Sequence, residues 1–150
     1  MGEIMTLPRR LNQKHPRVAL WLAFTAVFAV LCGVWIGIFA ANGKSFVWYA
    51  DTIKQHFPSL VYYGRWLREA ARCILSGSPI PTWDMSIGYG SDIVTTLSYY
   101  VMGDPLNLIA AFVPSQYGEP LLEALMLVRI YLAGLTFMLF SRHHGNSRFG

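Results

Sequence analysis

The stretch that decides the fold is VALWLAFTAVFAVLCGVWIGIFAA, residues 18–41, which carries no charged side chain. About twenty apolar residues in a helix cross the hydrocarbon core of a bilayer, so this stretch predicts a transmembrane helix. Four basic residues against one acid precede it: Arg9, Arg10, Lys14 and Arg17 against Glu3. This excess of basic residues predicts a cytoplasmic N-terminus. A cleaved signal peptide is the alternative, but the apolar run is longer than a typical signal sequence and no small-residue cleavage site follows it.

The composition agrees with a membrane protein. The chain is 54% hydrophobic and only 13% charged, whereas soluble domains carry about 25% charged residues. No run of Lys and Arg is long enough to bind nucleic acid, so a nucleic-acid partner is excluded and the lipid bilayer is the first partner expected. We therefore expect the chain in the bacterial cytoplasmic membrane.

A second apolar stretch, PLLEALMLVRIYLAGLTFMLF at residues 120–140, predicts a second transmembrane helix. Arg142, His143 and His144 follow it, and this basic end is expected on the cytoplasmic side. The predicted fold class is an all-α integral membrane protein with two spans around an outer loop. Its predicted parts are a cytoplasmic N-terminus (1–17), the first span (18–41), an extracytoplasmic loop with amphipathic helices (42–119), the second span (120–140) and a cytoplasmic tail (141–150).

The outer loop contains an amphipathic pattern from Pro58 to Leu75. Apolar residues recur there at three- and four-residue steps, and charged residues take the other face. The pattern predicts a helix on the membrane surface with its arginines toward the headgroups, ended by Gly77 and Pro79. The predicted apolar face is Leu60, Val61, Gly64, Leu67, Ala71, Ile74 and Leu75, and the charged face is Arg65, Arg68, Glu69 and Arg72.

Two further segments complete the outer loop. SPIPTWDMSIGYGSD, residues 78–92, is rich in Gly, Pro and polar residues and predicts an irregular loop. The apolar run from Leu106 to Val113 is too short to span a bilayer and follows Asp104-Pro105. It predicts a second surface helix or a re-entrant one.

Two charged residues stand out in this apolar chain. Asp51 lies shortly after the first span, with Gln55 four positions later on the same face if a helix has begun there. Asp51 is either a helix cap or solvated charge, or the acid of a site at the membrane face. Arg129 lies near the middle of the second span, where an arginine costs about 2.5–3.5 kcal/mol on insertion scales. Glu123 is on a different face, so no partner within this chain is evident: Arg129 would pair with a carboxylate on a helix outside it, or meet a lipid phosphate.

The order of these motifs resembles the N-terminal part of the YfhO family of bacterial membrane proteins, polytopic glycosyltransferase-like enzymes of the GT-C type. The family is linked to glycosylation of cell-surface polymers such as lipoteichoic acid. The resemblance covers roughly residues 18–141 and implies that the chain is an N-terminal fragment, whose partners include further membrane helices of the same protein. The matching motifs are Asp51 with Gln55 and Pro58, W-x₄-G-x-G from Trp83 to Gly90, Tyr99-Tyr100, Asp104-Pro105-Leu106-Asn107-Leu108, and Leu132-Ala133-Gly134.

The resemblance also implies a chemistry. The donor would be a sugar on a polyprenyl phosphate, the acceptor a cell-surface polymer, and the transfer would occur on the outer face. Asp51 would be the catalytic general base, with Gln55 positioning a sugar hydroxyl. Some related enzymes carry an Asp-Glu pair here, whereas this chain has Asp51-Thr52, so the resemblance does not imply a bridging metal. It implies no cofactor besides the lipid-linked sugar donor.

The remaining candidate substrate-binding residues each have a structural alternative. Asp104 would contact substrate or would simply begin a helix with Pro105. Trp83, Tyr99 and Tyr100 would stack on sugar rings or anchor the protein at the interface. Arg129 would bind the lipid phosphate or form a structural pair.

Two other functions remain open at this point. The chain could be a non-catalytic two-span anchor or assembly subunit whose outer loop binds a partner. A transporter would show spans broken by glycine and proline, whereas proline does not interrupt these two. Two spans cannot enclose a donor site, so we expect enzymatic activity only as part of a longer chain.

Overall fold

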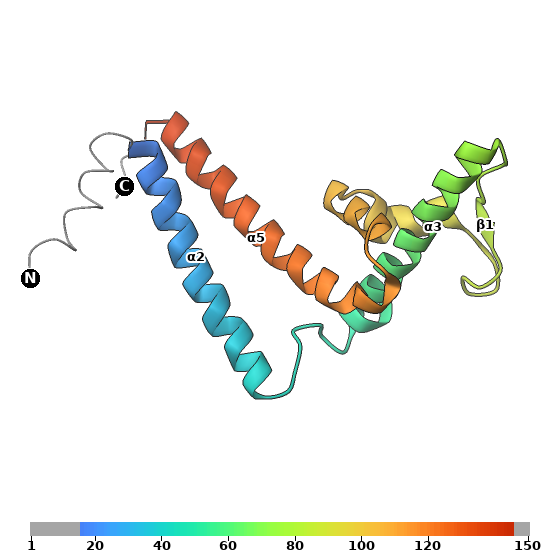
Figure 1. Ribbon diagram of the computed structural model, residues 1–150, viewed down its shortest axis with the longest axis horizontal. Helices are drawn as coiled ribbons and strands as arrows, with labels where there is room; N and C mark the ends of the chain where they lie inside the picture. Colours follow the sequence, from blue (N-terminus) through green and yellow to red (C-terminus); the bar gives the residue numbers. More distant parts are fainter. Residues whose placement is uncertain (1–15, 146–150) are drawn as a thin grey trace, which may run out of the picture. The chain divides into compact units, whose positions relative to one another are not determined.

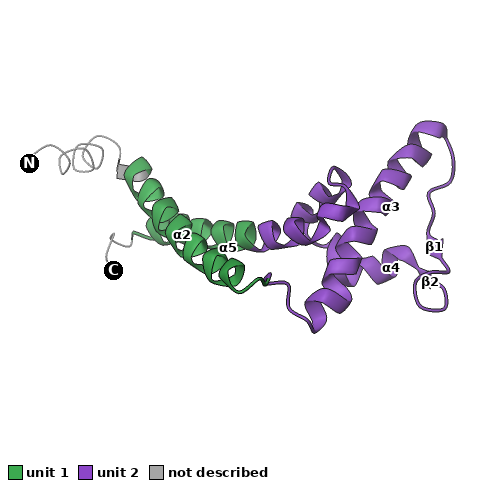
Figure 2. Ribbon diagram, turned by 60° about the horizontal axis from the view of Figure 1, so that its bottom comes forward, with its two compact units in different colours: residues 1–44, 127–150 green, residues 45–126 purple. Residues whose placement is uncertain are grey.

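The computed structural model describes residues 16–145, with side chains described from residue 18. The predicted basic segment at the N-terminus therefore lies outside the described residues, as does the end of the predicted tail. The chain is 75% helical, which confirms the predicted all-α class. It divides into two compact units, residues 1–44 with 127–150 (unit 1) and residues 45–126 (unit 2) (Figure 2).

Unit 1 contains helix α2 (Pro16–Ala41) and the part of helix α5 (Gly118–His143) from residue 127 onward (Figure 1). Both helices are long and apolar enough to cross a membrane, over Val18–Ala41 and Ser115–His143. In the most apolar stretch of each helix, almost no residue is fully buried inside the protein. A helix that is apolar all round is stable when lipid surrounds it, so both helices have the length and composition that the predicted spans require.

Within unit 1 the two helices meet along one face of α2. Residues at positions 21, 24, 25 and 28 share that face, because side chains three and four apart on a helix are neighbours. Tyr131 of α5 accepts a hydrogen bond from Trp21 Nε1 at 2.8 Å, and its hydroxyl lies 3.0 Å from that of Thr25. Gly134 lies under the ring of Phe24, where a Cβ would collide with the ring. The Leu132-Ala133-Gly134 motif thus provides the small residue that close helix packing in a membrane requires.

Unit 2 is built from short helices around one long one. Its core consists of buried apolar side chains from each of the longer segments: Leu60, Tyr63, Ile93, Leu97, Val101, Ala110, Leu122 and Leu125. In chain order its elements are the π-helical turn η1 (Thr52–His56), helix α3 (Phe57–Ser76), strands β1 (Trp83–Asp84) and β2 (Ser91–Asp92), helix α4 (Ile93–Leu97), the π-helical turn η2 (Ser98–Met102), the 3₁₀ helices η3 (Pro105–Ala111) and η4 (Ser115–Tyr117), and the start of α5.

Helix α3 confirms the predicted amphipathic helix. Gly77 ends it with the left-handed φ of 70° that glycine adopts without strain. Its buried face differs from the predicted one, because Tyr63 and Ala70 are buried while Ile74 and Leu75 are 67% and 88% exposed. The 3₁₀ helix η3 covers the middle of α3 but not its last turn, so the apolar stripe packs on protein over only part of its length.

The closest contact between α3 and η3 is at Gly64, where a Cβ would collide with the carbonyl group of Ala110. Arg68 extends this contact, because its Nη1 donates to the carbonyl oxygens of Ala110, Ala111 and Val113 at 3.1, 3.2 and 3.2 Å. The expectation that Arg68 points toward lipid headgroups is therefore wrong. Its charge instead satisfies carbonyl groups at the C-terminal end of η3, which have no partner inside the helix.

Two further segments differ from the prediction. The expected irregular loop contains a short antiparallel hairpin, in which Trp83 pairs with Asp92 and Asp84 with Ser91. Strands of two residues leave no alternating pattern in a sequence, so this hairpin could not be recognised. The run after Asp104 is a 3₁₀ helix packed on α3, with Asn107 buried and its Nδ2 donating to the carbonyl oxygen of Val101 at 2.9 Å.

Candidate functional site

Asp51 lies at the start of the first helical segment after α2. Its backbone is already helical, and its side chain is exposed and makes no capping hydrogen bond. Asp51 therefore does not cap the helix; its exposure fits the solvated-charge alternative, and its catalytic role stays a prediction. The turn that follows is π-helical, with Ile53 N donating to the carbonyl oxygen of Trp48 at 3.0 Å. Single π-helical turns occur frequently at functional sites.

Two of the predicted binding tyrosines lie close to this turn. The rings of His56 and Tyr100 meet edge to face with their centroids 5.9 Å apart. The ring centroids of Tyr99 and Tyr100 are 4.9 Å apart. His56 directly follows Gln55, which is exposed. The structure thus brings η2 against the turn that begins at Asp51, although Tyr99 and Asp51 are distant in the sequence.

Asp104 begins a helix together with Pro105, which was the structural alternative to a contact with substrate. Its Oδ1 accepts a hydrogen bond from Leu106 N at 2.9 Å, and Pro105 occupies the first turn of η3. This is an N-cap followed by proline, the arrangement expected at a helix start. A contact of Asp104 with substrate stays a prediction.

Arg129 belongs to unit 1, whereas the other predicted site residues belong to unit 2. Arg129 is not a free charge in the structure, because it interacts with another group, so the expectation that it stands without a partner is wrong. Spacing along one helix cannot reveal partners on other segments.

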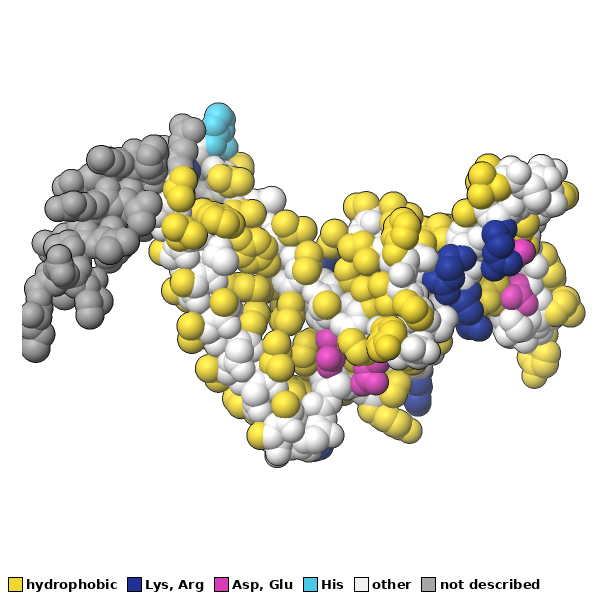
Figure 3. Space-filling model, in the orientation of Figure 1, with side chains coloured by type: hydrophobic (Ala, Val, Ile, Leu, Met, Phe, Trp, Pro, Cys, Tyr) yellow, Lys and Arg dark blue, Asp and Glu magenta, His cyan; other side chains and the backbone are white. Residues whose placement is uncertain are grey.

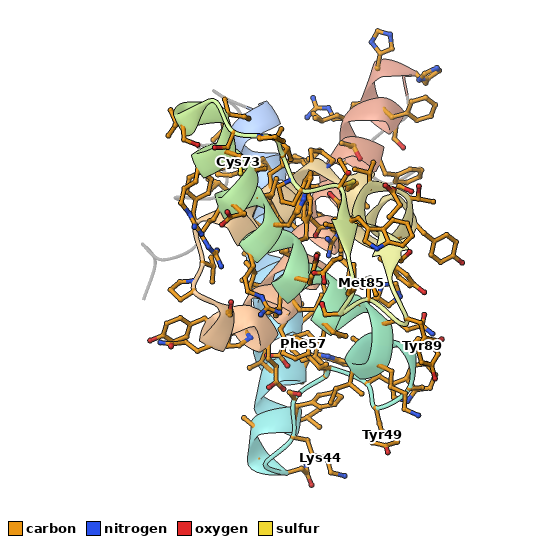
Figure 4. The ribbon with its side chains drawn as sticks, turned by 90° about the vertical axis from the view of Figure 1, so that its right-hand side faces the viewer. Lys44, Tyr49, Phe57, Cys73, Met85 and Tyr89 are labelled. Carbon is orange, nitrogen blue, oxygen red and sulfur yellow. The ribbon has the colours of Figure 1, made fainter. Side chains whose placement is uncertain are left out.

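A pocket of about 550 Å³ lies between α3 and the hairpin. Among the predicted site residues, Trp83 lines it. Figure 4 shows Met85 and Tyr89 on the hairpin and Phe57 and Cys73 toward the two ends of α3. We call this cavity the α3–hairpin pocket. Its lining residues include Tyr62, Arg65, Trp66, Arg68, Asp84 and Ser86.

Asp84 and Tyr62 form a short hydrogen bond in this pocket. Tyr62 Oη donates to Asp84 Oδ2 at 2.5 Å, and Ser86 N donates to Asp84 Oδ1 at 2.7 Å. The hydrogen bond from Tyr62, followed by those from Ser86 and the charge of Arg65, lowers the pKa of Asp84 below its usual range. Burial first, and then the hydrogen bond to Asp84, raise the pKa of Tyr62 to about 12. Asp84 is thus anionic and Tyr62 protonated at neutral pH.

Arginines form the opposite wall, on α3. Figure 3 shows Lys and Arg side chains gathered over α3 beside acidic ones. Arg65 lies over the ring of Tyr62 at 5.9 Å, and Arg72 pairs with Glu69 at 2.7 Å. The pocket therefore contains three guanidinium groups, counting Arg68, against two carboxylates, an excess of one positive charge.

The hairpin explains the W-x₄-G-x-G motif. Gly88 and Gly90 have φ values of 61° and 105°, which L side chains rarely adopt. A Cβ on Gly90 would lie 3.2 Å from Trp83 Nε1 and 2.9 Å from Met85 Sδ. The motif thus sets the turn and holds the Trp83 side chain against Gly90.

Sequence reasoning missed Asp84 and Tyr62 as site residues. Asp84 directly follows Trp83 in a motif that had been singled out, and this position was an available signal. Tyr62 lies on α3 on the other side of the pocket, and nothing in its spacing indicates that it reaches the hairpin. Among the residues that the structure describes, no group of three His, Cys, Asp or Glu side chains is arranged to hold a metal ion.

Two bilayer-length helices, with a folded helical unit between them in the sequence, define an α-helical integral membrane protein. Comparison with known families then identifies which one. Residues 23–149 match the family described as bacterial membrane protein YfhO, so the chain belongs to the YfhO family. No curated protein and no solved structure matches the chain.

Proposed function

We propose that this chain forms part of a polytopic, glycosyltransferase-like protein of the bacterial cytoplasmic membrane. It transfers a sugar from a polyprenyl-phosphate donor to a cell-surface polymer on the outer face, and its N-terminus is cytoplasmic. The observation that carries this proposal is Asp51, an exposed carboxylate without a capping bond on a π-helical turn soon after the first span. Membership of the YfhO family supports it.

In this reaction Asp51 is the general base. Its carboxylate takes the proton from the acceptor hydroxyl as that oxygen bonds to the anomeric carbon of the donor. The bond between the anomeric carbon and the phosphate oxygen breaks, and the lipid phosphate leaves with the electron pair. Gln55 positions a hydroxyl of the sugar, and Tyr99 and Tyr100 provide aromatic surface beside the same turn.

The membrane-embedded phosphate of the donor needs a cation. We propose that the guanidinium of Arg129, on the second span, binds this phosphate, since an arginine at that depth is favoured only where it meets an anion or a polar cavity. The further helices of the polytopic protein would close the donor site around it.

The test replaces Asp51 in the protein as the bacterium makes it and measures sugar attached to the purified cell-surface polymer. Asp51→Asn keeps the size of the side chain but removes the base, so transfer should fall by about 10²–10⁴-fold. Lys54→Gln is the matched control, because it changes an exposed charge on the same turn and should leave transfer within about two-fold. Transfer at the wild-type rate by Asp51→Asn, at equal protein in the membrane, would show that Asp51 is not the base.

A second function has one observation in its favour. Large aromatic side chains of unit 2 are strongly exposed, among them Trp48 (66%), Tyr89 (103%) and Phe112 (87%). Exposed aromatic residues of this kind suit a surface that binds another protein. If Asp51 is dispensable, we expect the outer unit to act as a non-catalytic assembly subunit through these residues.

A further inference from the structure

We propose that the α3–hairpin pocket is a second binding site, for a ligand that carries a phosphate ester next to free hydroxyl groups. The site is separate from the turn at Asp51, because Asp51, Gln55, Tyr99 and Tyr100 do not line the pocket. It goes beyond the proposed transfer reaction and does not depend on it.

The anionic part of the ligand is specified by Arg65. Arg68 already donates to three backbone carbonyl groups and Arg72 is paired with Glu69. In the described part of the chain, Arg65 makes no hydrogen bond or ion pair and is exposed, with its guanidinium over the ring of Tyr62. A guanidinium presents a planar fork of donors that matches two oxygens of a phosphate. The excess positive charge of the pocket also favours an anion.

The hydroxyl groups are specified by Asp84. An ionised carboxylate has about four acceptor sites, and those of Asp84 receive one bond from Tyr62 and one from Ser86. The remaining sites accept hydrogen bonds from ligand hydroxyls but repel a bare phosphate. Trp83 beside it is 60% exposed and provides an apolar surface for the C–H groups of a sugar or polyol. A carboxylate, an aromatic side chain and an arginine in one pocket therefore select for hydroxyls and an anion together.

The pocket is held in shape before any ligand binds. Trp66 Nε1 donates to the carbonyl oxygen of Pro81 at 2.9 Å, which fixes the chain leading into the hairpin against α3. The bond between Tyr62 and Asp84 fixes the first strand to the same helix. Little ordering remains to oppose binding, so even a small ligand can bind with measurable affinity.

The same chemistry has two natural sources, the glycerol phosphate headgroup of a phospholipid and a saccharide phosphate. Binding is measured by calorimetry with the full chain in an uncharged detergent, using glucose 1-phosphate as the probe. Glucose and inorganic phosphate are compared as the hydroxyl-only and charge-only ligands. We expect saturable binding of glucose 1-phosphate, and at least about ten-fold weaker binding of either simpler ligand.

The decisive variant is Arg65→Gln, which removes the exposed guanidinium without disturbing the core. It should weaken binding of glucose 1-phosphate at least about ten-fold, whereas Lys44→Gln, which removes an exposed charge elsewhere, should not change it. Equal affinity of Arg65→Gln and wild type would overturn the proposal. Equal affinity for inorganic phosphate would also overturn it, since the pocket would then be a plain anion site.

Two more arms complete the experiment. Asp51→Asn should bind the probe as wild type does; loss of binding there would place the ligand at Asp51 and overturn a separate site. If sugar transfer fails while the probe still binds, the proposed function falls and the binding site stands. If transfer is intact and the probe does not bind, the binding site falls and the proposed function stands. In nanodiscs, phosphatidylglycerol but not phosphatidylcholine removes probe binding if the natural ligand is a lipid headgroup, and neither does so if it is a saccharide phosphate.

Discussion

Tyr62 and Asp84 show how one hydrogen bond joins two elements that the sequence keeps apart. Tyr62 lies on α3 and Asp84 on β1. The bond lowers the pKa of Asp84, and burial first and then this bond raise the pKa of Tyr62. A pKa that differs between the folded and unfolded states makes stability depend on pH. This contact therefore has a signature that solution measurements can detect.

The pH dependence of stability follows from the sign of each shift. The pKa of Tyr62 rises from 10.0 to about 12 on folding, so its contribution is complete below pH 10 and is lost as the pH rises toward about 12. The lowered pKa of Asp84 acts at the other end: its contribution is present above its ordinary value and is lost as the pH falls through the folded-state value. We expect Tyr62→Phe to flatten the alkaline loss of stability, measured by thermal unfolding of both proteins in that alkaline range. Parallel alkaline curves for the two proteins would contradict the assignment.

For Asp51, the sequence predicts the position of the residue but not the surroundings of its side chain. Its position after the first span is evident from the sequence, and the structure adds that its carboxylate is exposed and does not cap a helix. For Arg68, the role predicted from its position in the sequence was wrong. Its place on the charged face of an amphipathic pattern suggested lipid headgroups, but three backbone carbonyl groups of a distant segment take its hydrogen bonds.

At the scale of elements, α3 against η3 is the contact that organises unit 2. The two backbones approach each other at Gly64, where no side chain fits above Ala110. Closer packing of backbones brings more buried contact, but it makes the position intolerant of even one methyl group.

We expect Gly64→Ala to destabilise unit 2 by about 1–3 kcal/mol, because the added methyl must push the Ala110 carbonyl aside. Gly103→Ala is the matched control, since a Cβ there meets nothing within 4 Å and the φ of −72° suits alanine. Its effect should stay within about 1 kcal/mol, in either direction. Chemical unfolding monitored by tryptophan fluorescence compares the two, and equal stabilities would show that the α3–η3 contact is looser than described.

The elements that could be predicted are those with a long-range pattern. Both spans follow from apolar length, and α3 follows from its periodicity and its glycine stop. The hairpin and the π-helical turns could not be predicted, because each is a few residues long and is stabilised by its neighbours. The α3–hairpin pocket was missed for the same reason, since its walls are separate segments whose approach no single pattern encodes.

At the scale of the whole molecule, the described chain consists of two membrane helices and a folded unit that the sequence places between them. Acidic residues at the start of α5 secure the first residues of unit 2: Glu119 accepts a hydrogen bond from Ser45 Oγ at 2.6 Å, and Glu123 accepts one from Phe46 N at 2.9 Å. The chain that leaves the first span is thereby tied to the helix that enters the second one.

The central claim is that unit 2 lies on the outer face, where sugar transfer and ligand binding are proposed to occur. Cysteine accessibility tests it most directly, in a protein with Cys32→Ser and Cys73→Ser that carries one new cysteine at a time. Tyr89→Cys reports on unit 2, because Tyr89 is fully exposed at the hairpin, and His144→Cys reports on the end of α5. A membrane-impermeant maleimide should label Tyr89→Cys in intact cells and His144→Cys only after the membrane is opened. Labelling of His144→Cys but not Tyr89→Cys in intact cells would place unit 2 in the cytoplasm and contradict the account.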